Sequence, residues 1–440
     1  MRRWLFFRVI PFTIRLMRPW FLVNRVMIFS RSRKGTLLRT SPSSCSSFIC
    51  FKFGGCAKLV CSAPIAQLDR VPGFEPGGYR FESCSVQMIS IFYHTQDSFA
   101  DTIFAQLGKG RLHARSLYGY FMRRGTIEGF EVEPEAERLK GEILERTSFE
   151  LPGYRVVVED GGTVKFLVDM GEGLEAEAVL IPMKSKTTLC VSSQVGCKMG
   201  CTFCETGRMG LLKSLGREEI VAQVAIAVHG LGRQVDNIVF MGMGEPFDNF
   251  DEVMGAIGVL CGGLGFGPSR ITVSTSGVVD MMDRFTEEAD PGVHLAVSVN
   301  APNDEVRKRV MPVNRKWNMA ELKGAMARFC AGGKREILVE YVLMEGINDS
   351  LESADELAEY LRGLRVKVNL IPYNPQKKDR FAPPGQDVIE AFAKKMKENG
   401  YLTLVRQTKG QQIRAACGQL GGVDKVKIWT QTKKIGRMEA

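Results

Sequence analysis

A repeat of short apolar strands and amphipathic helices fills most of this 440-residue chain and limits its fold more than any other feature. Six runs rich in Val, Ile and Leu recur between residues 187 and 374. After each run, apolar positions are spaced three to four residues apart, as on one face of a helix. Strands of this kind lie in parallel sheets whose crossover helices bury both faces. The pattern predicts an α/β domain over residues 183–408.

Residues 88–182 show a different order, in which helical patterns precede strands. Two amphipathic helices are expected first, and Leu117, Tyr120 and Phe121 form an apolar stripe that we assign to the core. Three strands separated by glycine turns follow, as in a small β-meander. We therefore expect an N-terminal accessory domain, while residues 409–440 form a C-terminal element with a basic tail.

The net charge of +10 lies almost entirely in the first 87 residues. That stretch holds 14 basic and 3 acidic residues, which leaves 45 basic and 46 acidic residues for the remainder. The overall charge is therefore no argument for RNA binding. Ala63–Cys84 resembles the peptide obtained when a transfer-RNA gene is translated in a protein frame. We expect residues 1–87 to be a disordered leader or the product of a misassigned gene start, with Met88 as the initiator; a transit peptide or a surface-lying helix is the alternative.

Three cysteines occupy eight residues in the spacing C-x3-C-x2-C, namely Cys197, Cys201 and Cys204. Soft thiolates select iron–sulfur clusters or zinc, and a four-iron cubane takes four such ligands. Three ligands leave one iron with an open position, where chemistry can occur. Neither a second Cys pair nor a nearby His completes a tetrahedral zinc site. The spacing favours a four-iron cluster, and clustered thiols fit a reducing cytosol.

The loop CVSSQVGCKMGCTFCETG resembles the signature of the radical S-adenosylmethionine (SAM) superfamily. The further motifs FMGMGEP, ITVSTSGVV, VNLIPYNP and AACGQL make the chain similar to the RlmN/Cfr family of RNA adenine methyltransferases, from about Leu107 to Leu420. This resemblance implies a partial (β/α)6 TIM-like barrel after the small helical and β accessory domain. Barrel chemistry is assembled at the C-terminal ends of the strands.

The resemblance implies a [4Fe-4S] cluster on the three loop cysteines, with SAM on the open iron. Glycines after a strand let a backbone approach a ligand, and a carboxylate there can hold an amino group. Asn300 departs from the family, which has His in that place; Asn keeps a donor and an acceptor but cannot titrate. The SAM contacts that the resemblance implies are Gly244, Glu245, Ser274, Ser298, Val299, Asn300 and Asn374.

Two further cysteines of the family match Cys190 and Cys417. The resemblance implies that one SAM methylates Cys417 and that the radical from a second SAM takes a hydrogen from this methyl group. The carbon radical then adds to adenine, and Cys190 releases the product by forming a disulfide with Cys417. A lone cysteine is otherwise most often a small core side chain, which is how we interpret Cys261 and Cys330.

Glu177 matches the family's general base, which would remove the ring proton of the adenine. Glu175 lies two residues earlier, on the same face of the expected strand. The residues alone do not distinguish these two carboxylates.

RNA would be held by local groups of basic residues, and the target adenosine would be splayed out of its RNA. A one-electron reductant such as flavodoxin or ferredoxin is the further partner implied. We expect a cytoplasmic monomer without a membrane segment. The candidate phosphate contacts are Lys184 and Lys186, Arg208 and Lys213, Arg307 to Arg309, Lys377 to Arg380, and Lys425 to Arg437.

These observations predict a radical SAM enzyme that methylates carbon 2 of an adenosine in 23S ribosomal RNA, with transfer RNA as a further candidate substrate. GMGEP and STSGVV favour carbon 2 over the Cfr-type reaction at carbon 8. The rival hypotheses are a radical SAM enzyme with a non-RNA substrate and a non-catalytic iron–sulfur or zinc protein. The sequences CETGRMG and GQQIRAACG depart from the family, as Asn300 does, and leave the exact substrate open.

Overall fold

The computed structural model describes residues 48–52, 58–62, 88–160, 162–331, 333, 335–376, 380–406 and 416–421. The chain divides into two compact units, Met1–Val86 and Gln87–Ala440. In the first unit, the described residues form an antiparallel pair of β1 (Phe48–Lys52) and β2 (Lys58–Ser62). The segment that resembles a translated transfer-RNA gene lies outside the described residues, so the leader stays a prediction.

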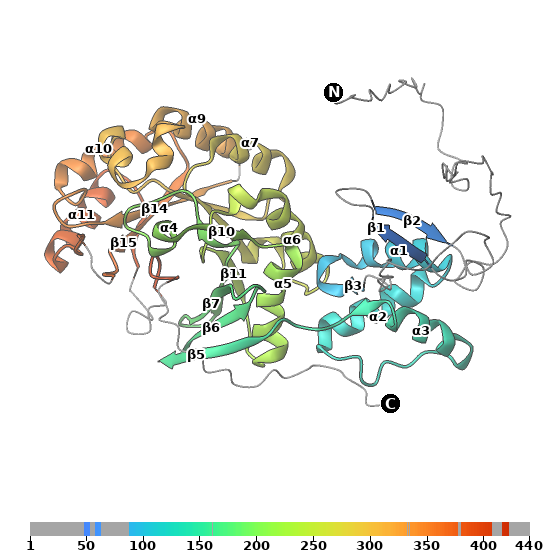
Figure 1. Ribbon diagram of the computed structural model, residues 1–440. Helices are drawn as coiled ribbons and strands as arrows, with labels where there is room; N and C mark the ends of the chain where they lie inside the picture. Colours follow the sequence, from blue (N-terminus) through green and yellow to red (C-terminus); the bar gives the residue numbers. More distant parts are fainter. Residues whose placement is uncertain are drawn as a thin grey trace, which may run out of the picture. The chain divides into compact units, whose positions relative to one another are not determined.

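One ten-stranded sheet organises the second unit (Figure 1), in the order β16-β15-β14-β13-β12-β11-β8-β7-β6-β5. Every neighbouring pair from β8 to β16 is parallel, which confirms the predicted α/β fold. Their apolar side chains are buried on both faces, as in other parallel sheets. These strands are β8 (Thr187–Cys190), β11 (Asn237–Phe240), β12 (Ile271–Thr275), β13 (His294–Ser298), β14 (Ile337–Leu343), β15 (Val366–Pro372) and β16 (Thr403–Val405).

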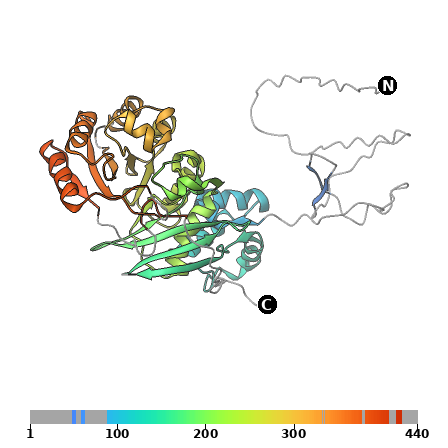
Figure 2. The ribbon, with the colours of Figure 1, turned by 60° about the vertical axis from the view of Figure 1, so that its left-hand side comes forward.

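Helices connect the parallel strands and cover the outside of the sheet (Figures 1 and 2). Side-chain caps define where several of them begin. At the start of α9, Asn318 accepts a hydrogen bond from the Glu321 N–H, and at the start of α10, Ser350 accepts one from the Ser353 N–H. The outer helices are α5 (Arg217–Ala225) with a π-helical turn (Ile226–Gly230), α6 (Phe250–Gly262), α7 (Val279–Glu288), α9 (Met319–Cys330), α10 (Leu351–Leu361) and α11 (Gln386–Glu398).

Smaller elements form the connections near the carboxyl ends of the strands. After β8, an antiparallel pair of β9 (Gln194–Cys197) and β10 (Gly210–Ser214) encloses the short helix α4 (Glu205–Met209). After β13, α8 (Asp304–Val310) follows. These connections carry the three cysteines predicted to bind the cluster, and also Val299 and Asn300 of the predicted SAM contacts.

The predicted β-meander is present as three antiparallel strands, β5 (Tyr154–Asp160), β6 (Thr163–Asp169) and β7 (Glu175–Pro182). It is not separate from the barrel, because β7 pairs with β8 and places Val179 opposite Cys190. The domain boundary that we predicted after residue 182 therefore falls inside one continuous sheet.

The N-terminal helices of this unit are α1 (Gln96–Leu107), α2 (Arg111–Arg124) and α3 (Glu137–Leu144), beside a short pair of β3 (Ile89–Ser90) and β4 (Thr147–Ser148). Leu117 and Phe121 of the predicted stripe on α2 are buried in the core. Tyr120 is half-buried, and its hydroxyl donates a hydrogen bond to the Glu128 carbonyl. Among the described residues, no helix is both long enough and apolar enough to cross a bilayer.

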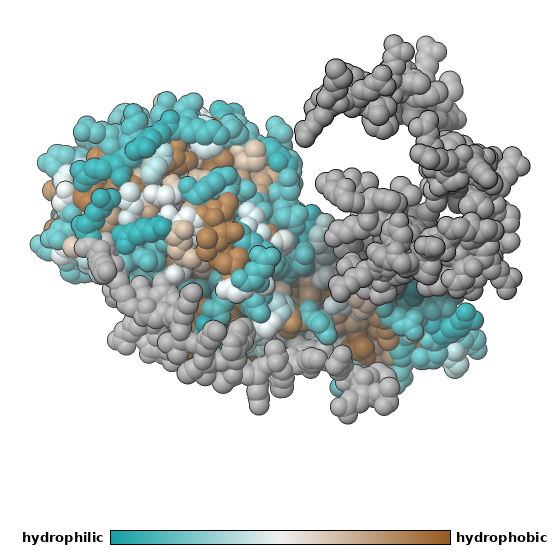
Figure 3. Space-filling view, viewed as in Figure 1, coloured by the Kyte–Doolittle hydropathy of each residue, from teal (hydrophilic) through white to brown (hydrophobic). Residues whose placement is uncertain are grey.

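The surface of the barrel side in Figure 3 is hydrophilic at its rim, and hydrophobic side chains gather towards its middle. The rim corresponds to the outer helices, whose exposed faces are polar. In Figure 1, α4 and β10 occupy the middle of this face, and Leu211 and Leu212 of β10 are exposed hydrophobic side chains.

We expect a chain that begins at Met88 to fold as the full chain does, because Gln87–Ala440 is a compact unit with its own sheet and core. Its melting temperature, followed by circular dichroism, should agree with that of the full chain to within about 2 °C. Aggregation of the shortened chain, or a clearly lower melting temperature, would show that the first 87 residues are part of the fold.

Candidate active site

The three-cysteine loop is held in place by close backbone contacts. Gly196 precedes Cys197 with φ of 76°, and a Cβ atom there would lie 1.9 Å from the Gly210 carbonyl oxygen. Only glycine therefore permits the β9–β10 pairing that frames the loop. On its other side the loop is tied to α8, because the Thr202 N–H donates to the Val310 carbonyl at 2.9 Å.

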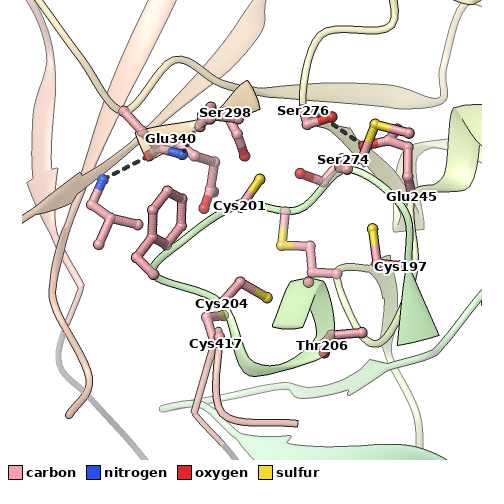
Figure 4. Close-up of a pocket in the computed structure, with 18 of the residues that line it drawn as sticks. Cys197, Cys201, Cys204, Thr206, Glu245, Ser274, Ser276, Ser298, Glu340 and Cys417 are labelled. Atoms are coloured by element: carbon pink, nitrogen blue, oxygen red, sulfur yellow. Dashed lines mark hydrogen bonds between the residues drawn. The ribbon is translucent and has the colours of Figure 1, made fainter. Parts of the chain in front are cut away.

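Cys197, Cys201 and Cys204 line one cavity at the carboxyl ends of the strands, together with Cys417 (Figure 4). Burial raises the pKa of Cys197 to about 12, and it raises the pKa of Cys201 and Cys204 as well. The neighbouring thiols add to the rise in the pKa of Cys201, because negative charges close together in the cavity repel each other. Bare thiolates are thus unfavourable here, and a bound metal group would have to displace the thiol protons.

The thiols fit a cluster better than a single metal ion. Within residues 88–406 and 416–421, as far as they are described, no three His, Cys, Asp or Glu side chains converge on one ion position. Figure 4 shows the three thiols spread around the cavity wall. A multi-iron cluster takes one thiolate at each of several irons, so spread ligands suit it. Phe203, between Cys201 and Cys204, is buried and lines the same cavity.

Gly244 and Glu245 lie at the carboxyl end of β11, on the cavity wall. Gly244 has φ of 102°, and a Cβ atom there would lie 2.6 Å from the Cβ of Gln194. The buried Glu245 carboxylate accepts hydrogen bonds from the Phe247 N–H at 3.1 Å and the Ser276 N–H at 2.7 Å. Burial raises the pKa of Glu245, and these backbone donors oppose that shift. A fixed, dry carboxylate of this kind suits a ligand amino group.

The other predicted SAM contacts divide into two sets. Ser274, Ser298 and Asn374 line the cavity, from the ends of β12, β13 and β15. Val299 is fully buried and does not line it; its N–H donates to the Glu340 carbonyl at 3.0 Å and continues the sheet. Among the described atoms, the Asn374 Oδ1 is buried without a hydrogen-bond partner. An orphaned acceptor on a cavity wall fits a ligand that donates to it.

Asn300 lines the cavity but uses its side chain within the protein. Its φ of 57° lies in the left-handed region, which Asn tolerates better than most residues. Its Oδ1 accepts from the Val342 N–H at 2.8 Å, and its Nδ2 lies 3.3 Å from the Met311 sulfur. The amide thereby extends the β13–β14 ladder by one hydrogen bond.

Cys417 lies on a turn, residues 416–421, that docks onto the barrel through backbone contacts. The Asn374 Nδ2 donates to the Cys417 carbonyl at 3.1 Å, and the Gln376 Nε2 donates to the Gly418 carbonyl at 2.8 Å. From the cluster loop, the Glu205 N–H donates to the same Gly418 carbonyl at 2.8 Å. The turn is therefore fixed against the loop that carries the cluster cysteines.

Arg406 follows β16 and points at the two further cysteines. Its Nη1 donates to the Cys417 Sγ at 3.2 Å. The Cys417 sulfur raises the pKa of Arg406, and Glu340 and Cys190 do so too. Burial raises the pKa of Cys190 to about 12; Cys417 adds to this shift, whereas Arg406 opposes it. Arg406 thus contacts Cys417, which lines the cavity, whereas Cys190 does not line it.

The structure gives different surroundings to Glu177 and Glu175, the two carboxylates that the sequence did not distinguish. Glu177 is buried, and its Oε1 accepts from the Gly421 N–H at 2.9 Å, on the turn of Cys417. Glu175 instead pairs with Arg155 at 2.9 Å, closer to the surface. Of the two, only Glu177 contacts the described part of the Cys417 turn.

The basic groups predicted to contact RNA phosphates differ in their surroundings. The prediction is wrong for Arg307, which is fully buried; it donates to the carbonyls of Val299, Ser276 and Ser298 and to Asn314 Oδ1. Lys308 and Arg309 beside it are exposed. Arg208 and Lys213 contact Thr202, Met170 and Glu219 of the protein. Lys184 and Lys186 are exposed at the amino end of β8, away from the cluster loop; residues 377–379 and 422–440 lie outside the described residues.

Sequence reasoning missed Arg406, Glu340 and Lys165, which surround the cysteine pair and Glu177. The sequence contained an indication of each of these residues. Arg406 follows the last apolar strand directly, and Glu340 and Lys165 interrupt strands that are otherwise apolar. Charged residues inside buried strands are rare unless they are paired.

The comparisons with known proteins agree with this site. The family model of the radical SAM superfamily matches residues 191–361, so the barrel and its three-cysteine loop define a radical SAM enzyme. A probable dual-specificity RNA methyltransferase, RlmN 1 of Protochlamydia amoebophila, is 49% identical over 339 residues, covering 76% of this chain and 95% of the relative. The dual-specificity RNA methyltransferase RlmN of Geobacter sulfurreducens is 41% identical, covering 72% and 87%. The chain belongs to the RlmN family of radical SAM RNA methyltransferases.

A solved structure shares the architecture. The crystal structure of a radical SAM methyltransferase from Sphaerobacter thermophilus superposes with a TM-score of 0.69 at 39% identity, and the match covers 75% of this chain and 98% of that chain.

Replacement of Cys197, Cys201 or Cys204 by Ala should abolish iron loading, because each thiol is predicted to bind a different iron of the cluster and the loop has no spare thiol. Iron and sulfide analysis after anaerobic reconstitution measures this. Cys261→Ala and Cys330→Ala, in α6 and α9 of the outer layer, are the matched controls and should load normally. A full cluster in any of the three loop variants would mean that the ligands are assigned wrongly.

Arg307→Met should destabilise the unit by at least about 3 kcal/mol, because it leaves four buried acceptors without a donor. Urea unfolding followed by circular dichroism measures the change. The exposed neighbour gives the control: Lys308→Met should shift the unfolding free energy by less than about 0.5 kcal/mol. Equal stability of the two variants would contradict the role of Arg307 as a clamp of the strand ends.

Proposed function

We propose that this chain methylates carbon 2 of an adenosine in 23S ribosomal RNA and also in transfer RNA. The observation that carries the proposal is the placement of Cys417 on the wall of the cavity that the three loop cysteines line. The names of the relatives, dual-specificity RNA methyltransferase, support two RNA substrates.

The residues present fit the two cofactors of this reaction. Cys197, Cys201 and Cys204 would hold the [4Fe-4S] cluster, and the fixed carboxylate of Glu245 and the orphaned Oδ1 of Asn374 suit the amino acid portion of SAM. When bound, these groups supply the methyl group and a 5′-deoxyadenosyl radical. Every other role falls to side chains of the chain itself.

Cys417 is the methyl carrier in this proposal, and Cys190 is the thiol that releases the product. Docking of the 416–421 turn against the cluster loop brings the Cys417 sulfur to the cavity. Arg406 donates a hydrogen bond to that sulfur and so fixes its position at the cavity.

Glu177 is the base that takes the ring proton of the adenine. It is the carboxylate that contacts the Cys417 turn, which is the support for choosing it over Glu175. The proposal also includes a one-electron reductant, such as flavodoxin or ferredoxin, and a monomer that works in the cytoplasm.

Mass spectrometry of adenosines tests the substrate and the ring position together. RNA from a deletion strain should lack 2-methyladenosine at a site in 23S ribosomal RNA and in transfer RNA, and the returned gene should restore it. Loss of 8-methyladenosine instead would assign the chain to the Cfr-type reaction. Unchanged RNA would exclude both reactions.

Cys417→Ala should load the cluster and cleave SAM, because neither step needs that thiol, yet it should transfer no methyl group to RNA. Cys190→Ala should stall later and accumulate protein bound covalently to RNA. This species survives denaturation, disappears on nuclease digestion, and should not form in the double variant. Cys330→Ala serves as the control, and normal methylation by Cys417→Ala would refute the carrier mechanism.

A further inference from the structure

A lysine is buried beside the candidate base. Lys165 lies on β6, a strand whose two neighbours, β5 and β7, cover both of its edges. Its side chain is 1% exposed, and its Nζ lies 2.5 Å from the Oε2 of Glu177, which is 3% exposed. Lysine is almost never fully buried without a partner, because a desolvated ammonium group costs a great deal of free energy.

The strand register brings the pair together. Leu167 lies opposite Glu177 and Lys165 lies opposite Val179, so Lys165 reaches Glu177 across the diagonal of one sheet face. Cys190 lies opposite Val179 on the next strand and shares this face. The ion pair therefore belongs to the wall that carries the product-releasing thiol.

The second carboxylate oxygen of Glu177 has a different partner. Its Oε1 accepts the Gly421 N–H from the turn that carries Cys417. The Glu177 backbone is also held, because the Ser192 Oγ donates to its carbonyl at 2.6 Å. A cation thus fixes one oxygen while the other faces the turn at which the methyl group is carried.

We propose that Lys165 is a positioning residue for Glu177: its ammonium group pairs with Oε2 and holds Oε1 towards the target adenine. This inference rests on the proposed function, in which Glu177 is the base. In that step the C–H bond at carbon 2 breaks and its proton goes to Glu177. Lys165 exchanges no proton in this step, so it acts only through the carboxylate.

A purely structural role explains the burial less well. Two apolar side chains would pack between β6 and β7 at equal or lower free energy, because a buried ion pair seldom repays the desolvation of both charges. A second pair on the same face, Arg155 with Glu175, is more exposed, at 10% and 30%, and contacts no described part of the Cys417 turn. That pair supplies a matched control.

The test uses the full reconstituted chain with four variants: Lys165→Met, Lys165→Arg, Glu177→Gln and Arg155→Met. In Lys165→Met, SAM cleavage and methylation of Cys417 should persist, because both precede the proton transfer. Methylation of RNA should fall about 10- to 100-fold, as for loss of a general base, and the covalent protein–RNA species should accumulate. Lys165→Arg should retain more activity than Lys165→Met, and Arg155→Met should match the wild type.

The double variant keeps the inference testable if Lys165→Met fails to fold. Lys165→Met with Glu177→Gln removes both charges and should be as active as Glu177→Gln alone, because Lys165 acts only through Glu177. A further loss in the double variant, wild-type methylation by Lys165→Met, or an equal loss in Arg155→Met would overturn the inference. Absence of 2-methyladenosine from the wild-type reaction would instead refute the proposed function.

Discussion

The pairing of β7 with β8 is the interaction on which the rest of the candidate site depends. It sets Val179 opposite Cys190 and so places Glu177, two residues earlier on β7, on the same sheet face as that cysteine. A register shift of one residue would turn the whole set to the opposite face. The antiparallel strands therefore belong to the same continuous sheet as the barrel, although they precede it in the sequence.

A second constraint is that the buried cations have partners inside the protein. Arg307 donates to carbonyls and an amide, Lys165 pairs with Glu177, and Arg406 donates to the Cys417 sulfur. Unpaired charges would be costly at this depth. These contacts hold the strand ends and the candidate site residues in place, and they leave Arg307 buried while its neighbour Lys308 is exposed.

The sequence predicted the parallel sheet, its helices and the cluster loop because these follow from local periodicity and from spacing within eight residues. Contacts between distant segments could not be read in the same way. Arg307 sits in a run of three basic residues, which is typical of an exposed face, and only the fold shows that it is buried. The choice between Glu175 and Glu177 likewise depends on Gly421, more than 240 residues away.

The departure at Asn300 illustrates how such a contact changes an interpretation. In the sequence, Asn in place of the family's His left the substrate open, because an imidazole can titrate and an amide cannot. In the structure, the backbone at Asn300 is left-handed and its amide bonds to the Val342 N–H. Both features belong to the barrel wall, where the amide substitutes for one hydrogen bond of the ladder. The departure therefore adjusts how β13 ends, at a position on the cavity wall.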